Sequence, residues 1–525
     1  MSPLPTLILL SGLLLAACGP AVTQMEETAV PTNTAVSTPT QNPPTPTPLP
    51  TETPISNPQS FANAQDRSLI SDNDIPHLLQ ALLNTDTDES QEALVRIQDS
   101  GDGRFVSVLL ELYRARQIGI IRNLNYSAVT NALKNLSGQD FGDDWAAWVE
   151  WYGATDLQPP PGFTTWKGIL LSNIDPSFAD FLQDSYPVRL RPEEIMWGGV
   201  LVDGIPALDN PTMITPEEAE YLNLWDVVFG ISLNGDSRAY PLRILDWHEM
   251  ANDVVGGVPV SLAYCTLCGA AIAYDGRATD TNHNPITYDF GSSGFLYRSN
   301  KLMYDRQTRT LWNQLTGEPV LGELAAADIR LKLLPVVLTT WKEWQTQHPD
   351  TVVVDINTGV NRDYNPGAAY GGYFADTDTM FPVWQRDEAL RTKDQIYALN
   401  INDTPKAYSL DSLTAEQTIN DKLGGVNIVL VAGNEIYEVD GEHWLDGLVR
   451  YKAGAEVRAY ERGDHTFTLG TDKNSIVDET GQVWPVTEEA LIGLDEDSLP
   501  RINGHLAYWF GWYAFYPGTL LYGEE

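Results

Sequence analysis

The chain has 525 residues and a formal net charge of −39 at pH 7. A protein this acidic repels the phosphates of nucleic acids, so we expect no nucleic-acid partner, and the same charge argues against docking on anionic lipid through a basic patch. The length is sufficient for about two to four domains.

The N-terminus resembles a bacterial lipoprotein signal. An apolar run of about fourteen residues ends in Leu-Ala-Ala-Cys at Cys18, whereas a membrane-spanning helix needs about twenty. A short apolar run closed by small residues is typical of a secretory signal. The resemblance implies that residues 1–18 are the signal, that Cys18 is lipidated, and that its lipid holds an extracytoplasmic lipoprotein in the bilayer of the cell membrane. An ordinary cleaved signal beside a chance cysteine is the alternative.

The next part of the chain changes from a linker composition to a helical pattern. The Pro- and Thr-rich residues 19–60 cannot form a packed core and predict a disordered stalk. Residues 61–160 repeat apolar side chains at i, i+3 and i+4, the pattern of amphipathic helices. Short breaks at Gly, Asp and Asn predict an all-α cap similar to HEAT-type repeats, a class that commonly presents a surface to a protein partner. We expect residues 161–190 to be a connector.

From about residue 191 the sequence predicts β-hairpins and repeats itself. Short alternating runs are separated by Gly, Asn-Gly and Asp turns. Residues 228–265 align without gaps on residues 396–433, with 11 of 38 positions identical. We therefore expect two copies of one unit, at residues 191–375 and 376–525. The fold class is α+β: an all-α helical cap followed by two duplicated, β-rich α+β units.

The two copies differ at the residues that carry chemistry. In the order of the alignment, the first copy has His248, Glu249, Cys265 and Cys268, and the second copy has Glu416, Gln417, Gly433 and Ile436. Because the second copy lacks all four side chains, the fold does not require them. The sequence therefore predicts a functional site in the first copy and a degenerate second copy.

Cys265 and Cys268 form a C-x-x-C-G motif between two predicted strands. The motif is similar to a rubredoxin-type knuckle, a tight turn whose backbone N–H groups point at the sulfurs. The pair fits a metal ligand set, a working dithiol or an inert disulfide. His248 lies near the end of a short predicted helix, and an imidazolium beside the sulfurs would favour thiolate. Cys265, Cys268 and His248 are thus the candidate catalytic residues.

The same three residues are candidate metal ligands. Two thiolates and one imidazole leave one coordination position open, which suits a catalytic zinc or a copper ion. His283 and His348 are further imidazoles to consider. The identity of a cofactor stays open between copper, zinc and none.

Residues 290–322 are rich in polar groups at expected turns. A tight loop at Ser292, Ser293 and Gly294 would offer backbone N–H groups to an anion. Asp305 and Trp312 have rough counterparts in the second copy at Asp478 and Trp484, which favours a structural role. The pocket candidates are Glu249, Ser293, Tyr297 and Gln314.

Several motifs in order resemble the domain of unknown function 3179 family. They are "GGVLVDGIPAL", "RAYPLRILDWHEMANDVVGGVPVSLAYCTLCGAA", "FGSSGFLYRSNKLMYDRQTRTLWNQLTGE" and "WKEWQTQHPDT". The resemblance covers about residues 190–365 and, more weakly, the rest of the chain. Some members carry selenocysteine in the region that matches Cys265 or Cys268, which implies redox or soft-metal chemistry.

Together these features predict an envelope-anchored protein with redox or metal-dependent activity at the C-x-x-C pair, of the oxidoreductase class if it is an enzyme. The alternative is a non-catalytic surface lipoprotein that binds a ligand or a protein and contains a structural disulfide.

Overall fold

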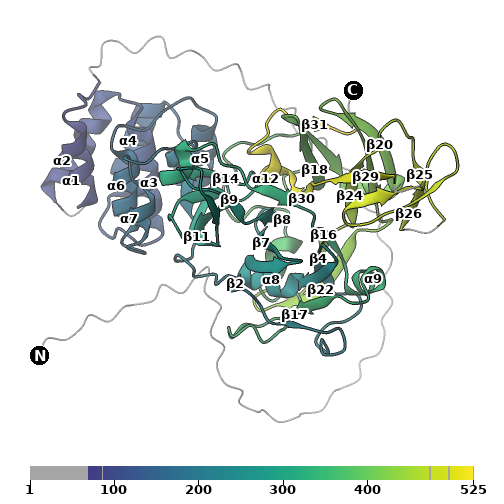
Figure 1. The fold of residues 1–525 in the computed structure, drawn as a ribbon. Helices are drawn as coiled ribbons and strands as arrows, with labels where there is room; N and C mark the ends of the chain where they lie inside the picture. The colour runs from purple at the N-terminus through teal and green to yellow at the C-terminus, as the bar shows by residue number, and fades with distance from the viewer. Residues whose placement is uncertain (1–68, 85–86, 472–473, 495–496, 524–525) are drawn as a thin grey trace, which may run out of the picture. The chain divides into compact units, whose positions relative to one another are not determined.

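The computed structural model describes residues 69–84, 87–471, 474–494 and 497–523. The expected signal, Cys18 and the expected stalk lie outside these residues. The described chain begins with helices α1–α7 and continues as a β-rich α+β region with several sheets (Figure 1). The helical N-terminal region and the β-rich region that the sequence predicts are both confirmed. No helix within the described ranges has the length and apolar character needed to cross a membrane.

The helical region extends further than the sequence indicates. Its helices are α1 Ile75–Leu83, α2 Asp88–Ser100, α3 Phe105–Gln117, α4 Tyr126–Ser137, α5 Trp145–Gly153, α6 Phe163–Leu171 and α7 Phe178–Phe181. The last two lie in residues 161–190, which we expected to be a connector. Gly162, with a φ of 85°, allows the chain to turn after a proline run and begin α6. Phe163 and Trp166 of α6 are then buried in the same apolar cluster as α1–α5.

We call residues 191–375 the first unit. Its helices are the 3-10 helices η1 Pro192–Glu194 and η2 Glu323–Ala326 and the α-helices α8 Leu242–His248, α9 Trp341–Gln347 and α10 Gly371–Ala375. Its strands are β1 Ile195–Trp197, β2 Leu208–Asp209, β3 Met213–Ile214, β4 Val227–Leu233, β5 Asp236–Pro241, β6 Met250–Val255, β7 Val258–Cys265, β8 Ala270–Asp275, β9 Arg277–Thr279, β10 Pro285–Thr287, β11 Phe290–Tyr297, β12 Asn300–Asp305, β13 Leu311–Asn313, β14 Glu318–Leu321, β15 Lys332–Leu334, β16 Val337–Thr340 and β17 Val352–Val354. The sheets have the orders β16-β4-β5-β17-β3, β15-β8-β7-β6-β2, β1-β11-β12-β13-β14 and β10-β9.

We call residues 376–525 the second unit. Its helices are α11 Leu410–Glu416 and α12 Trp509–Tyr513. Its strands are β18 Gln395–Ile401, β19 Thr404–Ser409, β20 Thr418–Leu423, β21 Val426–Ala432, β22 Tyr437–His443, β23 Gly447–Gly454, β24 Val457–Glu461, β25 Thr468–Leu469, β26 Ser475–Val477, β27 Val483–Pro485, β28 Ala490–Ile492, β29 Ser498–Ile502, β30 His505–Tyr508 and β31 Leu520–Leu521. The sheets have the orders β30-β18-β19-β31, β20-β21-β24-β29-β28, β22-β23 and β25-β26-β27.

The two units contain matching elements at a constant spacing. β4, β5, α8, β6 and β7 begin 168 residues before β18, β19, α11, β20 and β21. The same internal hydrogen bond recurs, because Tyr240 Oη donates to Asp253 Oδ2 at 2.7 Å and Tyr408 Oη donates to Asp421 Oδ2 at 2.8 Å. In both units the second strand of the first hairpin also pairs with a later strand that runs parallel to it: β5 pairs with β17, and β19 pairs with β31.

The match is interrupted at the cysteine turn. In the first unit a short turn joins β7 to β8, and these two strands pair. In the second unit β21 pairs instead with β24, and the hairpin β22–β23 is inserted between them. The correspondence of Cys268 with Ile436 is therefore wrong, because an alignment without gaps cannot show an insertion.

The inserted hairpin packs on the first unit. Tyr437, Val439 and Ala453 join the apolar cluster that contains the core of β4, β7 and α8. The backbone N–H of Glu442 donates to Pro366 O at 3.0 Å. The second unit thus contributes to the surroundings of the first unit's site.

Candidate functional site

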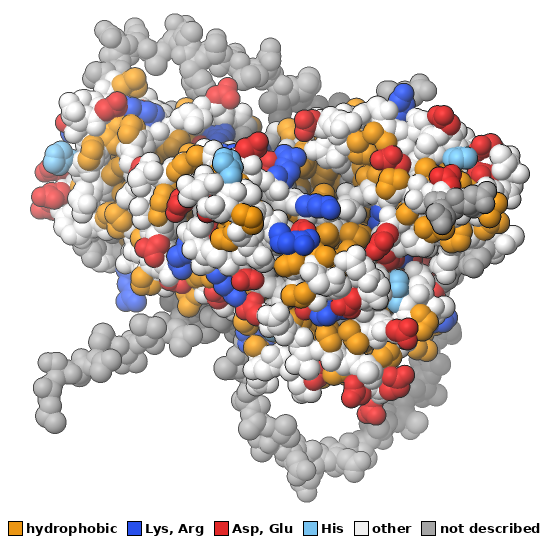
Figure 2. All heavy atoms as spheres, viewed as in Figure 1, with side chains coloured by type: hydrophobic (Ala, Val, Ile, Leu, Met, Phe, Trp, Pro, Cys, Tyr) orange, Lys and Arg blue, Asp and Glu red, His pale blue; other side chains and the backbone are white. Residues whose placement is uncertain are grey.

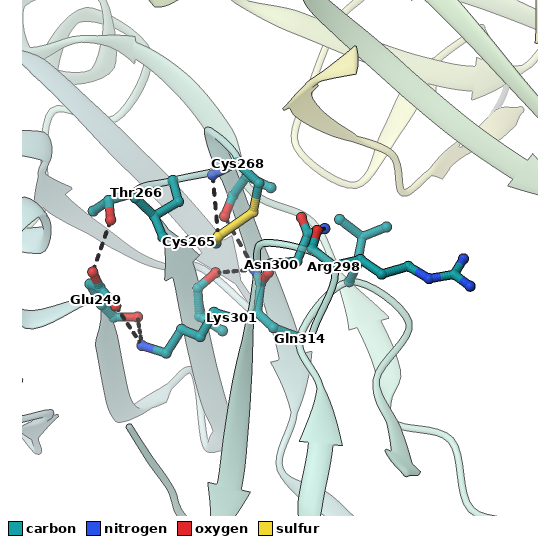
Figure 3. Close-up of a disulfide and its surroundings, with 12 residues drawn as sticks. Glu249, Cys265, Thr266, Cys268, Arg298, Asn300, Lys301 and Gln314 are labelled. Carbon is teal, nitrogen blue, oxygen red and sulfur yellow. Dashed lines mark hydrogen bonds and ion pairs between the residues drawn. A yellow bond between two sulfur atoms is a disulfide. The ribbon is translucent and has the colours of Figure 1, made fainter. Parts of the chain in front are cut away.

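Cys265 and Cys268 lie on the turn between β7 and β8 and are joined by a disulfide (Figure 3). Their Cα atoms are 5.5 Å apart. The N–H of Cys268 donates to Cys265 Sγ at 3.3 Å, which is the kind of N–H to sulfur contact that the knuckle motif predicts. Gly269 has a φ of 63° and lets the chain turn into β8.

A buried polar network begins at Glu249 and reaches the cysteine turn. Glu249 follows α8 with a φ of 53°, which directs its side chain away from the helix. Glu249 Oε1 accepts from Thr266 Oγ1 at 2.9 Å and from Tyr370 Oη at 3.2 Å. Lys301 Nζ donates to Glu249 Oε2 at 3.1 Å and to its backbone oxygen at 3.2 Å. Thr266 stands between the two cysteines, so this network holds the turn itself.

The disulfide is covered by residues from α10, β30 and α12. Cys265 is 1% exposed and Cys268 is fully buried. Tyr373 Oη donates to Leu267 O at 2.6 Å, and the N–H of Tyr508 donates to Cys268 O at 2.8 Å. A Cβ atom at Gly511 would stand only 2.7 Å from Cys268 Cβ. Glycine at position 511 therefore lets α12 lie directly against the disulfide.

His248 makes its hydrogen bonds away from the cysteines. Its Nδ1 lies 2.8 Å from Pro206 O, and its Nε2 lies 2.6 Å from Tyr364 Oη. A carbonyl oxygen only accepts, so Nδ1 carries the hydrogen and Nε2 accepts from the phenol. Burial lowers the pKa of His248, although the Pro206 carbonyl opposes this effect. The lowered pKa favours the neutral imidazole, and both ring nitrogens bond groups other than the sulfurs.

A metal site is not apparent at the predicted ligands. Among the described residues, no group of three or more His, Cys, Asp or Glu side chains is arranged to hold a metal ion. His348 Nδ1 bonds Ser237 Oγ and its ring packs on Trp344, and His283 lies at a turn with a φ of 63°. The donors present do not fit zinc or copper, so we derive no step through a metal.

The remaining pocket candidates separate into two groups. Gln314 is close to the disulfide, because its Nε2 donates to Ala263 O at 3.0 Å and to Ala270 O at 3.2 Å. Ser293 lies within β11, where its Oγ donates to Leu302 O at 2.5 Å and accepts from the N–H of Phe295 at 3.0 Å. The expected loop is thus part of strand β11, at a bulge between Ser292 and Leu296, and the Ser293 hydroxyl is already paired there.

Tyr297 and the Asp305–Trp312 pair make contacts that support the fold. Tyr297 is buried, packs on Phe515, and has its pKa raised by burial. Trp312 Nε1 donates to Asp305 Oδ2 at 2.8 Å, and the second unit repeats this contact at 3.0 Å. The second pair is Trp484 and Asp478.

Several site residues were missed by the sequence reasoning. Lys301 and Tyr370 have no recognisable motif, although a lysine inside the buried strand β12 is an unusual residue that could have been noticed. Lys393 Nζ lies 3.7 Å from the ring centroid of Tyr373, and burial lowers its pKa to about 8. Asp246 of α8 is buried, and its Oδ1 has no hydrogen-bond partner among the described residues. Burial raises the pKa of Asp246 well above its ordinary value, and the nearby charge of Glu249 adds to this effect.

The fold and site define a class: an α+β protein with a helical N-terminal region and a buried C-x-x-C disulfide held by a carboxylate–lysine pair. Residues 202–519 match the model of the family described as protein of unknown function (DUF3179). The chain belongs to this family, as the sequence motifs indicate. No curated protein and no solved structure matches it.

Proposed function

We propose that the chain is a redox protein in which Cys265 and Cys268 alternate between disulfide and dithiol. The observation that carries this proposal is the buried network of Glu249, Thr266 and Lys301 at the cysteine turn. Burying charged and polar groups is costly unless they are paired. The second unit, which matches the first element by element, has Gln417 and Gly433 instead of Glu249 and Cys265. The network thus serves the cysteines and not the fold.

The chemistry requires an external dithiol as reductant. A thiolate of that dithiol attacks one sulfur, the Cys265–Cys268 bond breaks, and a mixed disulfide forms. The second thiol of the reductant then attacks the reductant's own sulfur in the mixed disulfide. This releases the protein sulfur as a thiol, and the reductant leaves as a disulfide. Two electrons and two protons end on the cysteines. Because the N–H of Cys268 points at Cys265 Sγ, the sulfur of Cys265 is the better thiolate of the two.

A redox titration tests this proposal. We expect the peptide that contains Cys265 and Cys268 to change from unalkylated to doubly alkylated at a potential above about −300 mV, since structural disulfides resist reduction until below that value. The measurement is mass spectrometry after equilibration in dithiol buffers and acid quenching. The double variant Cys265→Ser/Cys268→Ser is the control and should show no transition. A disulfide that persists well below about −300 mV would contradict the redox function.

A non-catalytic binding role is the second candidate, and the burial of both sulfurs favours it. A protein thiolate cannot reach the disulfide while α10 and α12 cover it. The hairpin β22–β23 offers a surface for a partner at its tip, where Trp444, Leu445 and Leu448 are 62%, 68% and 89% exposed. In this role the disulfide stabilises the turn and is never reduced, so the same titration separates the two functions.

We also propose that Cys18 is lipidated and anchors the protein to the cell membrane. The support is the apolar run and the Leu-Ala-Ala-Cys sequence that ends it. We expect the Cys18→Ser variant to appear in the soluble extracytoplasmic fraction or to keep its signal, whereas the wild type sediments with membranes. Fractionation followed by immunoblotting measures this. Unchanged membrane attachment of the variant would show that another feature holds the protein.

We propose the domain arrangement that the sequence predicts, with one change to the helical region. We propose that the first and second units arose by duplication, supported by the constant spacing of 168 residues between matching elements. The helical region resembles HEAT-type repeats in composition, and we propose that it binds a protein partner. In view of α6 and α7, this region includes residues 161–181.

The acidic side chains spread over the face in Figure 2 agree with a surface that avoids nucleic acid.

A further inference from the structure

Two buried amide oxygens beside the disulfide have no hydrogen-bond partner. Asn300 is 1% exposed and Gln314 is fully buried. Asn300 Oδ1 and Gln314 Oε1 have no donor among the described residues. A buried acceptor without a donor costs free energy, so most such atoms in folded proteins are paired.

The identity of these free atoms as oxygens is fixed by their neighbours. Asn300 Nδ2 donates to Arg298 O at 2.9 Å. Gln314 Nε2 donates to Ala263 O and Ala270 O. Carbonyl oxygens only accept, so rotating either amide by 180° would place two acceptors against each other. The oxygens must therefore be the atoms that remain free.

Both amide groups lie beside the cysteine turn. The position of a Cβ atom at Gly511 would be 2.9 Å from Asn300 Oδ1 and 2.7 Å from Cys268 Cβ, so these two atoms border the same point. Ala270, which Gln314 contacts, is the cross-strand partner of Cys265. Figure 3 draws both amides next to the disulfide.

A disulfide has no hydrogen to donate, but a dithiol has two. Reduction creates one S–H on each sulfur, and a thiol is a weak donor. In a buried site these hydrogens need acceptors. The oxidised form thus leaves two acceptors unpaired at the place where the reduced form provides two donors.

We propose that Asn300 and Gln314 are positioning residues whose amide oxygens accept the thiol hydrogens of reduced Cys268 and Cys265. This inference rests on the proposed redox function, because it concerns the reduced state of the same pair. The two residues stabilise the dithiol relative to the disulfide. They make the pair easier to reduce by an external dithiol, which supplies the two electrons and two protons and leaves as a disulfide.

The test compares the equilibrium constant for reduction in apolar variants and matched controls. We expect Asn300→Leu and Gln314→Met each to shift the equilibrium toward the disulfide by about threefold to tenfold, the range for one buried hydrogen bond. Asn503 and Gln395 also have an unpartnered amide oxygen and an amide nitrogen bonded to a backbone carbonyl, but these carbonyls belong to Leu333 and Lys452. Asn503→Leu and Gln395→Met should leave the equilibrium constant unchanged.

The outcomes separate this inference from the proposed function. A wild-type pair that cannot be reduced in the titration overturns both. The inference alone is overturned if the wild-type pair is reduced but both site variants keep the wild-type equilibrium constant. The same holds if the variants change that constant no more than the controls do. If a variant does not fold, the Raman S–H band of the reduced wild type decides, since the S–H stretching band of a hydrogen-bonded thiol lies at lower frequency than that of a free thiol. A band at the free-thiol position would overturn the inference.

Discussion

In the Gly511→Ala variant, we expect a small dithiol to reduce the Cys265–Cys268 disulfide about tenfold to a hundredfold faster than in the wild type. The added methyl would stand 2.7 Å from Cys268 Cβ and 2.9 Å from Asn300 Oδ1. Cys268 Cβ is bonded directly to the backbone and its sulfur is held in the disulfide, so this atom cannot move aside and α12 must shift. Overpacking of this kind costs about 1–3 kcal/mol, and each 1.4 kcal/mol removed from the cost of opening raises the rate about tenfold.

Whether Gly511→Ala speeds or slows reduction shows whether α12 limits access to the disulfide. Alanine is a better helix former than glycine by about 1 kcal/mol, so a mere gain in the stability of α12 would slow reduction. Gly518→Ala is the matched control, because a Cβ at Gly518 meets no atom within 4 Å. The measurement is the pseudo-first-order rate of reduction at a fixed dithiol concentration, read by alkylation and mass spectrometry. Equal rates in Gly511→Ala and the wild type would show that α12 does not limit access.

Much of the fold follows from local patterns. Helical periodicity predicts the helical region, and alternating runs with Asn-Gly or Asn-Asp turns predict the hairpins β4–β5 and β18–β19. The hairpin β22–β23 was missed, because an inserted pair of strands interrupts a repeat without changing its flanks. Its packing on the first unit depends on contacts between residues far apart in sequence, which no local pattern shows.

The site was predictable only where its residues are close in sequence. Cys265 and Cys268 are three positions apart, and their spacing alone indicates a shared turn. Glu249 meets Lys301 across 52 residues and Tyr370 across 121, so neither partner could be paired with it from the sequence. The direction of His248 was likewise hidden. Neighbouring residues at a helix end point to different sides, and the positive φ of Glu249 sends that side chain to the cysteine turn while His248 faces Tyr364.

A buried ion network joins the two units and predicts a large loss of stability. Arg458 Nε donates to Glu488 Oε1 at 2.9 Å, and Arg458 also pairs with Glu456. Arg501 pairs with the other oxygen of Glu488 and donates to Val336 O of the first unit at 2.9 Å. Removing one partner of such a pair leaves a buried charge without compensation. The network therefore holds the second unit against the first.

We expect Arg458→Met to lower the free energy of unfolding by about 3–5 kcal/mol. Urea denaturation at pH 7, followed by tryptophan fluorescence, measures the change. The matched control is Arg450→Met, because Arg450 pairs with Asp440 on the exposed hairpin β22–β23, and solvent screens such surface pairs so that they contribute little to stability. A loss no larger than that of the control would show that the network contributes little to the union of the units.

The same network predicts how stability changes with acid. Burial alone would raise the pKa of Glu488, but the charges of Arg458 and Arg501 lower it to about 2, compared with the ordinary 4.5. Because the folded-state pKa is below the unfolded-state value, the stabilisation is fully present above about pH 4.5 and is lost as the pH falls toward 2. We expect the wild type to lose stability across this window, by urea denaturation at a series of pH values. The decline should be shallower in Arg458→Met, where Glu488 has one cation fewer. Parallel curves for the two proteins would mean that Arg458 does not set the protonation of Glu488.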